Sequence, residues 1–361
     1  MRRRRVLSIA SGLLAVGLVV SFLAYQERIL YVAGQAVFQG ELLWGRVPID
    51  EAIASGRYSD DEVRQLQRIG EIKAYGVQIG LAGSQNYDSI NPTWDHTIWN
   101  LSASDPVKFE NVRWWFPIVG SMPYIGYFDR VPADEKKAEL EAEGYDVYLR
   151  TAGAYSTLGW FRDPVMPAML KWDEYRLANT ILHELTHATV WIRGSVQFNE
   201  SFANFVGDEA ARSYMVDRYG PDSAEVTAME DRIRDGEDWR TFMRGIYHDL
   251  DAVYTDDALS RDDKLAQKAA ILGSLGQRID GVGFRDPERY RKYVTESDWN
   301  NARMMQFRTY NRSRDWFDQL YQREQSDLPR FMARVQEIAA NADDPYRALA
   351  DAVGADFDAE E

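Results

Sequence analysis

The stretch that decides how this chain is interpreted is Ile181-Leu182-His183-Glu184-Leu185-Thr186-His187-Ala188-Thr189-Val190. Successive residues of a helix are 100° apart, so His183 and His187 lie one turn apart on one face, where both imidazoles can bind a single ion. Glu184 lies beside the first histidine. Two histidines at this spacing with an adjacent glutamate are typical of zinc hydrolases, in which the glutamate is the general base.

A third metal ligand has to come from another segment, because a catalytic zinc site takes three protein ligands and leaves one position for water. The stretch Phe198-Asn199-Glu200-Ser201-Phe202-Ala203-Asn204 follows at short range. Glu200 stands at the start of the next predicted helix, and a short turn between antiparallel helices brings it back across the histidines. Asp208 and Glu209 lie two turns further along and are less well placed. The sequence therefore predicts one Zn²⁺ ion held by His183, His187 and Glu200.

Glu184 is not needed as a ligand, and its position suits a general base. Zinc lowers the pKa of bound water to around 7, and a carboxylate within hydrogen-bond reach can take the proton and pass it to the departing amine. The chain has only 4 histidines, and two of them fall in this motif. His96 and His248 have no such partner pattern and are predicted to be surface or packing residues.

The composition restricts the class of protein. With 361 residues, 45% of them hydrophobic, the chain can bury a large core. Its formal net charge is −15 although Arg2 to Arg5 contribute four cations, so the body is more acidic still and is a poor nucleic-acid binder. The chain has no cysteine, which excludes disulfides, a thiol nucleophile, thiolate metal ligands and a lipid-modified cysteine.

The N-terminal segment predicts a membrane anchor. After the four arginines, Val6 to Ala24 carries no charge and is long enough to cross a bilayer as a helix. Arginines before the span keep the N-terminus in the cytoplasm and place the body on the other side. A cleaved signal peptide is the alternative. Residues 1–25 are therefore interpreted as an anchor or a signal sequence.

Residues 26–361 are interpreted as one α+β domain, predominantly helical, with a small mixed β-sheet. Residues 26–165 begin with helix and become β-rich, residues 166–220 form the zinc-binding helices, and residues 221–361 are helical. The expected strands are 112–118, 122–128 and 145–150. The expected helices are 25–46, one starting at the capping box Ser59 to Glu62, 132–143, 171–193, 199–219, 262–279 and 328–340.

The stretch from Ala154 to Pro164 precedes the histidine helix and contains Gly159. A glycine at a sheet edge lets another backbone approach closely, so a substrate main chain can pair there as an added strand. Gly159 is therefore a candidate for binding the substrate backbone. An ordinary turn with a packed Trp160 is the alternative.

With both metal-binding stretches in view, the chain resembles the gluzincin metallopeptidases, a group that includes thermolysin and relatives of aminopeptidase N. More narrowly it resembles a bacterial family of predicted zinc aminopeptidases, many of them envelope lipoproteins. The stretches that carry this narrower resemblance are Gly40–Leu43, Arg46–Ile49, Phe116–Gly120, Pro123–Phe128, Ser156–Phe161, Asn300–Ala302 and Thr309-Tyr310.

The resemblance implies a gluzincin-like zinc-peptidase core in which His183, His187 and Glu200 bind zinc and Glu184 is the base. It also implies that Tyr310 stabilises the oxyanion and that Asn204 holds a ligand histidine. The expected activity is that of an aminopeptidase acting on a peptide or protein substrate at the bacterial inner membrane, with the catalytic body in the periplasm. An endopeptidase acting on envelope proteins and a non-catalytic envelope scaffold are the alternatives. The chain has no Gly-Ala-Met-Glu-Asn stretch like that of aminopeptidase N.

Overall fold

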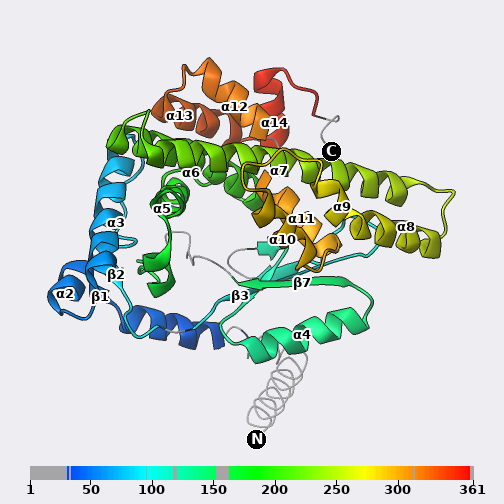
Figure 1. Cartoon of the computed structure of the whole chain (residues 1–361), viewed down its shortest axis with the longest axis horizontal. Helices are drawn as coiled ribbons and strands as arrows, with labels where there is room; N and C mark the ends of the chain where they lie inside the picture. The colour runs from blue at the N-terminus through cyan, green and yellow to red at the C-terminus, as the bar shows by residue number, and fades with distance from the viewer. Residues whose placement is uncertain are drawn as a thin grey trace, which may run out of the picture.

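The computed structural model describes residues 31, 34–94, 96–116, 120–151, 162–311 and 314–357. Figure 1 shows a mostly helical molecule in which α6 (Val196–Tyr219) and α7 (Ala224–Thr255) run across the upper part, while β3 (Trp99–Ser104) and β7 (Asp146–Thr151) lie in the lower centre. The predicted α+β class with a helical majority is confirmed.

The helix α3 (Asp60–Gln78) begins at the predicted capping box. The Ser59 hydroxyl accepts from the Glu62 backbone N–H, and the Glu62 side chain accepts from the Ser59 backbone N–H. Further along, Gly76 faces α5 (Glu174–Thr189), where an added Cβ would lie 2.9 Å from Leu185 Cδ1. A glycine at this point therefore lets α3 pack closely on the histidine helix.

The β-structure differs from the single mixed sheet that the sequence predicts. The described strands form three small sheets, and the strands within each are antiparallel. The largest has the order β6-β3-β7, formed by β6 (Ile125–Tyr127), β3 (Trp99–Ser104) and β7 (Asp146–Thr151), with α4 (Arg130–Ala142) joining β6 to β7. The prediction of a mixed sheet was wrong. The strand β3 lies between β6 and β7 and pairs antiparallel with both, so no two neighbouring strands of this sheet are parallel.

The N-terminal half also contains several short strands and helical turns. They are β1 (Val47–Pro48), α2 (Ile49–Ala54), β2 (Ser89–Ile90), β4 (Trp114–Phe116), β5 (Gly120–Met122) and the 3₁₀ turn η1 (Pro167–Lys171). The strand expected at 122–128 is divided by Pro123 between β5 and β6, since proline cannot donate to a ladder.

Helices make up the C-terminal half, as the sequence predicts. They are α8 (Arg261–Gly273), α9 (Leu275–Ile279), α10 (Pro287–Thr295), α11 (Asn301–Asn311), α12 (Arg314–Arg323), α13 (Leu328–Ala339) and α14 (Pro345–Val353). The helix expected at 262–279 is divided at Ser274, whose backbone N–H bonds the last carbonyls of α8. Figure 1 shows α12, α13 and α14 on the outer side of α6, with α5 on its other side.

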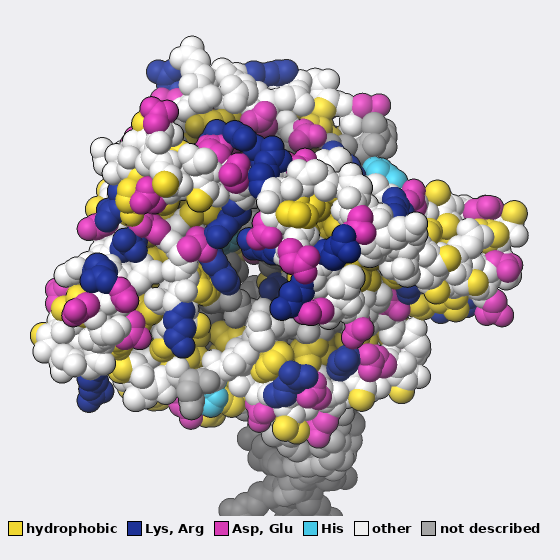
Figure 2. All heavy atoms as spheres, viewed as in Figure 1, with side chains coloured by type: hydrophobic (Ala, Val, Ile, Leu, Met, Phe, Trp, Pro, Cys, Tyr) yellow, Lys and Arg dark blue, Asp and Glu magenta, His cyan; other side chains and the backbone are white. Residues whose placement is uncertain are grey.

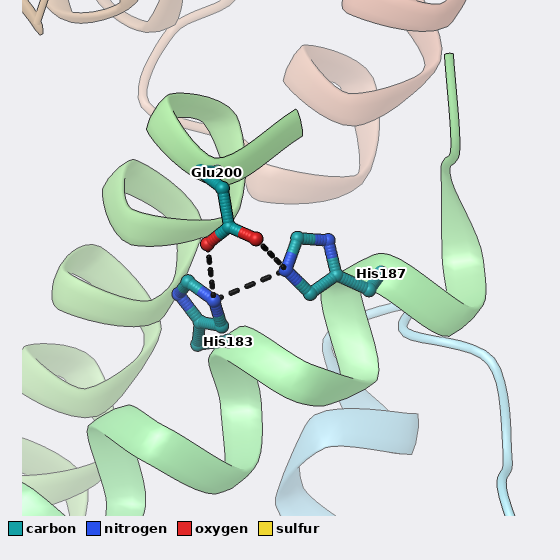
Figure 3. Close-up of side chains that lie close together, drawn as sticks. All are labelled: His183, His187 and Glu200. Atoms are coloured by element: carbon teal, nitrogen blue, oxygen red, sulfur yellow. Dashed lines mark hydrogen bonds and ion pairs between the residues drawn. The ribbon is translucent and has the colours of Figure 1, made fainter. Parts of the chain in front are cut away.

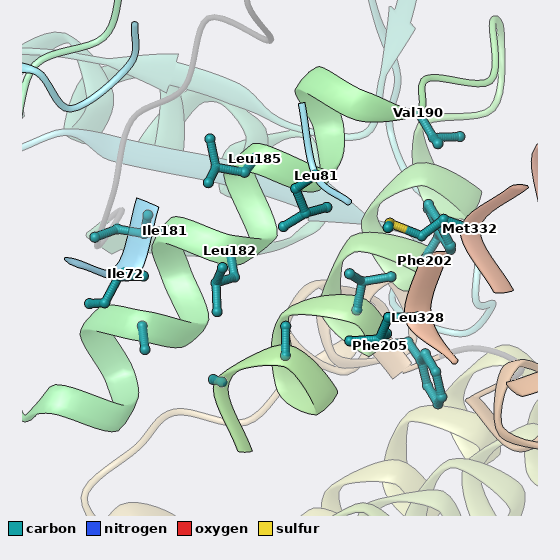
Figure 4. Packing of buried hydrophobic residues seen from close by; sticks show 14 of the residues in the cluster. Ile72, Leu81, Ile181, Leu182, Leu185, Val190, Phe202, Phe205, Leu328 and Met332 are labelled. Carbon is teal, nitrogen blue, oxygen red and sulfur yellow. The ribbon is translucent and has the colours of Figure 1, made fainter. Parts of the chain in front are cut away.

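The main hydrophobic core joins α3, α5, α6 and the helices α12 to α14. Figure 4 shows Ile181, Leu182 and Leu185 of α5 on one side of this core and Phe202 and Phe205 of α6 near α13 on the other. Each such side chain contributes about 1.5–3 kcal/mol when fully buried. This packing fixes the orientation of α5 and α6, and with it the side chains on their remaining faces.

No helix within the described ranges is long and apolar enough to cross a membrane. The predicted anchor Val6 to Ala24 lies outside the described residues and stays a prediction. The interpretation of residues 26–361 as a single domain also stays a prediction.

Candidate metal centre

The histidine helix α5 has a well-defined start. Asp173 is its N-cap and accepts a hydrogen bond from the Arg176 backbone N–H at 3.0 Å. The helix ends at Thr189, because Val190 adopts an extended conformation. It is therefore shorter than the predicted range 171–193. Lys171 belongs to η1, and the chain leaves the helix before it reaches Gly194.

The turn between α5 and α6 is held by the side chain of Asn199. Its Oδ1 accepts from the Ile192 backbone N–H at 2.8 Å, and its Nδ2 donates to the carbonyl oxygens of Ile192 at 2.7 Å and Ser195 at 2.9 Å. Asn199 is fully buried. This residue therefore fixes the return of the chain that places Glu200, its neighbour, over the histidines.

Figure 3 shows His183, His187 and Glu200 pointing toward one another from α5 and α6. The two Nε2 atoms are 3.1 Å apart. Glu200 Oε2 lies 3.5 Å from His183 Nε2, and Glu200 Oε1 lies 3.7 Å from His187 Nε2. The predicted helix-turn-helix arrangement thus brings these three side chains together, with their candidate ligand atoms within 4.8 Å of one another.

These distances fit a zinc ion. Four ligands placed tetrahedrally at the usual zinc bond lengths are about 3.3 Å from one another, close to the three separations found here. The donor set of two imidazoles and one carboxylate is that of a catalytic site with a position left for water. His183, His187 and Glu200 could therefore hold one metal ion, with each residue supplying one atom.

The protonation states also suit a metal. Burial and the neighbouring His183 lower the pKa of His187 to about 4, although Glu200 acts in the other direction. At neutral pH this imidazole is therefore uncharged, as a metal ligand must be. Burial by itself raises the pKa of Glu200, but the two histidines and Arg150 together hold it below its ordinary value, so the carboxylate is ionised.

The pKa of His183 is shifted in the opposite direction to that of His187. Burial lowers its pKa, but the nearby carboxylates of Glu200, Glu184 and Asp208 outweigh burial and raise the pKa above the ordinary value. A cation is therefore favoured at this point, and a proton or a metal ion can supply it.

Glu184 follows His183 on α5 and is half-buried. Its charge acts on Tyr87, whose pKa is raised well above the ordinary value, first by burial and then by Glu184 and Asp163. Tyr87 is fully buried and has a positive φ of 62°, a conformation that is uncommon for a tyrosine. Tyr87 could not be predicted as a neighbour of Glu184, because nothing in the local pattern around residue 87 indicates that it lies near residue 184.

The weaker candidates for the third ligand are engaged elsewhere. Asp208 Oδ1 accepts from Asn179 Nδ2 at 2.6 Å, and its Oδ2 accepts from Arg314 at 2.6 Å. Glu209 lies 3.9 Å from Arg314. Neither belongs to the group that could hold a metal, in agreement with the choice of Glu200.

The other predicted site residues are placed less completely. Asn204 lies one turn after Glu200 on α6 and is half-buried, and its role in holding a histidine stays a prediction. Tyr310 is on α11, which contacts α6, β3 and β7, but its side chain lies outside what the structure describes. Gly159 lies outside the described residues.

A second residue that the sequence analysis missed is Arg150 on β7. Its guanidinium acts electrostatically on Glu200 and helps to lower the pKa of that carboxylate. No sequence motif connects the two residues, since the sheet that carries Arg150 meets the metal centre only through the tertiary fold.

No curated protein and no solved structure matches this chain. A family model does match, and it covers most of the chain, including every element from β1 to α13. The chain belongs to the family described as "Putative aminopeptidase", whose model matches residues 30–349.

Proposed function

We propose that this protein is a gluzincin-type zinc aminopeptidase that binds one Zn²⁺ ion through His183, His187 and Glu200. The observation that carries the proposal is the geometry of these three side chains, whose candidate ligand atoms lie within 4.8 Å of one another. The family supports a peptidase, and the donor set supports zinc as the metal.

In the proposed reaction, the zinc ion and the protein side chains have different roles. A zinc ion bound here supplies a Lewis acid and lowers the pKa of a water molecule to around 7. Glu184, next to the ligand His183, takes the proton of the attacking water and gives it to the amine that leaves. Arg150 contributes positive charge near Glu200 and, together with His183 and His187, favours the ionised form of that carboxylate.

The packing of α5 and α6 fixes the positions of the metal-binding side chains and Glu184. The fully buried side chain of Asn199 fixes the turn before Glu200, and the apolar face of α5 is fixed in the main core. Preorganised groups of this kind avoid reorganisation during the reaction. We further propose that Tyr310 stabilises the developing oxyanion, that Asn204 orients a histidine ligand and that Gly159 pairs with the substrate backbone.

The proposed location is the periplasmic side of a bacterial inner membrane. It is supported by the uncharged segment Val6 to Ala24 behind four arginines. The substrate is a peptide or protein on that side of the membrane.

The test compares the zinc-loaded full-length protein with its Glu184→Gln variant on peptides with free and with acetylated N-termini. Wild type is expected to cleave the free peptides, and the variant is expected to keep its zinc and lose at least about 10²-fold in kcat. A wild-type protein that cleaves only acetylated peptides would contradict the aminopeptidase assignment and favour an endopeptidase. A wild-type protein that binds zinc and cleaves neither would contradict the peptidase assignment.

A further inference from the structure

The helix at residues 34–44, with Tyr31 just before it, is docked on the body of the protein by one face. The Tyr31 hydroxyl donates to the Gly126 carbonyl oxygen of β6 at 2.6 Å, and Gln35 Nε2 donates to the same oxygen at 2.9 Å. Leu42 is fully buried. Positions 31, 35 and 42 lie on one side of a helix, so this side holds the helix against the sheet.

The opposite side of this helix is apolar and exposed. Val37 is 61% exposed and Trp44 is 91% exposed, and their spacing of seven residues places them on one stripe. The Trp44 ring folds back over Gly40, since a Cβ built on Gly40 would lie 3.2 Å from the Trp44 Cζ3 atom. The indole therefore lies along the outer surface of the helix.

The exposed side of the helix carries almost no charge. The outward side of a surface helix normally carries charged residues, and Figure 2 shows Lys, Arg, Asp and Glu side chains spread widely over the face drawn. From residue 29 to residue 45 the only charged residue in the sequence is Glu41, whose carboxylate lies 3.6 Å from His96 Nε2. Apolar side chains gathered on an exposed surface of this kind indicate an interaction site.

The chain before this helix limits what lies against it. The predicted anchor ends at Ala24, and Tyr31 is already fixed on β6. The seven residues from one to the other span at most about 25 Å, whereas α7, with 32 residues, is about 48 Å long. A bilayer that holds Val6 to Ala24 therefore lies within reach of the helix at residues 34–44.

The side chains on the exposed stripe fit a lipid surface. Tryptophan has an apolar ring and a polar N–H group, and it is enriched where headgroups meet acyl chains. A helix that lies flat at this boundary buries its apolar face by about 5–10 Å. Because the body of the protein is acidic and is repelled by anionic headgroups, an apolar contact suits it better than an electrostatic one.

We propose that the helix at residues 34–44 lies flat on the membrane, with Val37 and Trp44 inserted between the headgroups and the acyl chains. This inference rests on the membrane location in the proposed function and deepens it, because it names the protein surface that faces the lipid. Figure 1 shows this helix, in dark blue, on the lower side of the molecule and α12, α13 and α14 on the upper side. The catalytic body thus has a fixed side toward the bilayer.

The test uses the absence of cysteine from the chain, because one introduced cysteine then carries the only fluorescent label. Full-length protein with Val37→Cys or with Trp44→Cys is labelled and reconstituted in phosphatidylcholine vesicles, with and without nitroxide groups on the acyl chains. Both labels are expected to lose fluorescence in the nitroxide vesicles, since this quenching requires contact with the acyl chains. Labels that keep their full fluorescence overturn the proposal.

The matched control is a label on Val77→Cys, at an apolar position of α3 that is 53% exposed. This end of α3 is near α13, since a Cβ built on Gly80 would lie 3.2 Å from Pro329 Cγ, and Figure 1 shows α13 on the upper side. The label at position 77 is expected to keep its fluorescence in both kinds of vesicle. Equal quenching at positions 37 and 77 would contradict the assignment of one membrane-facing side.

A second substitution tests the part played by Trp44. Trp44→Asp, added to the protein labelled at position 37, is expected to reduce the quenching there, because an ionised carboxylate is costly to remove from water. Val77→Asp in the same labelled protein is expected to leave the quenching unchanged. Quenching that survives Trp44→Asp in full would contradict the insertion of Trp44.

Flotation of the full-length protein with the vesicles tests the membrane location independently. If the protein floats and neither label is quenched, the location stands and the contact through residues 34–44 falls. If the protein does not float, the location falls and the contact falls with it. Cross-linking between copies through the cysteine at position 37, in place of quenching, would indicate that a second copy of the chain covers this surface and would overturn the proposal.

Discussion

Gly207 of α6 lies directly against His183 of α5. A Cβ built on Gly207 would be 3.1 Å from the His183 Cβ and 3.1 Å from the carbonyl oxygen of Asn179. The two helices approach this closely because residue 207 has no side chain. Glu200 lies two turns earlier on the same face of α6, so the close approach at Gly207 also brings Glu200 within reach of both imidazoles.

Substitution of Gly207 by alanine is expected to weaken the metal centre. The added methyl group meets backbone on α5, which cannot move aside as a flexible side chain can, so the helices separate by a few tenths of an ångström. We expect the free energy of unfolding to fall by about 1–3 kcal/mol and the zinc affinity to fall with it. Urea unfolding and competition with a zinc chelator measure the two effects.

The matched control for this variant is Gly245→Ala on α7. Gly245 has no neighbouring atom within 4 Å of an added Cβ, so alanine should stabilise the helix by about 0.5–1 kcal/mol. Equal zinc affinity in Gly207→Ala and wild type would show that the close approach does not position the ligands.

Substitution of Glu200 by glutamine is expected to remove the anionic ligand while keeping the size of the side chain. Zinc affinity should fall by at least about 100-fold, more than is typical for residues that only support a ligand. The control is Glu209→Gln on the same helix, which lies outside the group that could hold a metal. Competition with a chelator of known affinity measures all three proteins, and similar dissociation constants for the two variants would rule out Glu200 as a ligand.

Zinc is also expected to stabilise the folded chain, since the ion binds the assembled site and not the separated ligands. At a free concentration 100 times the dissociation constant, the gain in the free energy of unfolding is about 2.7 kcal/mol. Thermal unfolding with zinc and with a chelator measures this difference. The double variant His183→Ala, His187→Ala should unfold at the same temperature in both conditions. If the unfolding temperature of wild type is also the same with zinc and with the chelator, the result argues against a metal site here.

The N-cap of the histidine helix provides a prediction with a pH dependence. Burial raises the pKa of Asp173, but hydrogen bonds from Arg232 and from the Arg176 backbone N–H outweigh burial and lower the pKa below the ordinary value. The folded state therefore favours the ionised carboxylate. Its stabilising effect is complete above the ordinary pKa of about 3.9 and is lost as the pH falls through the lowered pKa.

Asp173→Ala should accordingly cost about 1 kcal/mol at pH 7, and the difference from wild type should disappear in strong acid. The ion pair with Arg232 adds little, because both side chains are substantially exposed. Ser195→Ala is the control, because Ser195 is the N-cap of α6 but makes no capping hydrogen bond with its side chain. Urea unfolding at several pH values checks both variants, and a difference that stays constant as the pH falls far below the ordinary pKa of aspartate would contradict the assigned cause.

The sequence predicted the parts of the fold that depend on local signals. The spacing of His183 and His187 and the capping box at Ser59 act within one or two turns of helix, and the structure contains both. Glu200 was also found, because only a short turn separates its helix from α5. The helical C-terminal half followed from periodicity over many residues.

The features that depend on long-range contacts could not be predicted from the sequence. The strand β3 contains Asn100, Ser102 and Ser104, residues that rarely indicate a strand, and it is stabilised by pairing on both sides. Its omission led to the wrong sheet. Tyr87 and Arg150 reach the surroundings of the metal centre from segments far away in the chain. No local pattern predicts such approaches.

The most direct measurement of the central claim is the amount of zinc bound per chain, determined by elemental analysis of the full-length protein after zinc loading and removal of free metal. The account predicts one zinc ion per chain in wild type and in Glu184→Gln, and none in His183→Ala, His187→Ala. Zinc retained by the double histidine variant, or absent from the loaded wild type, would contradict it.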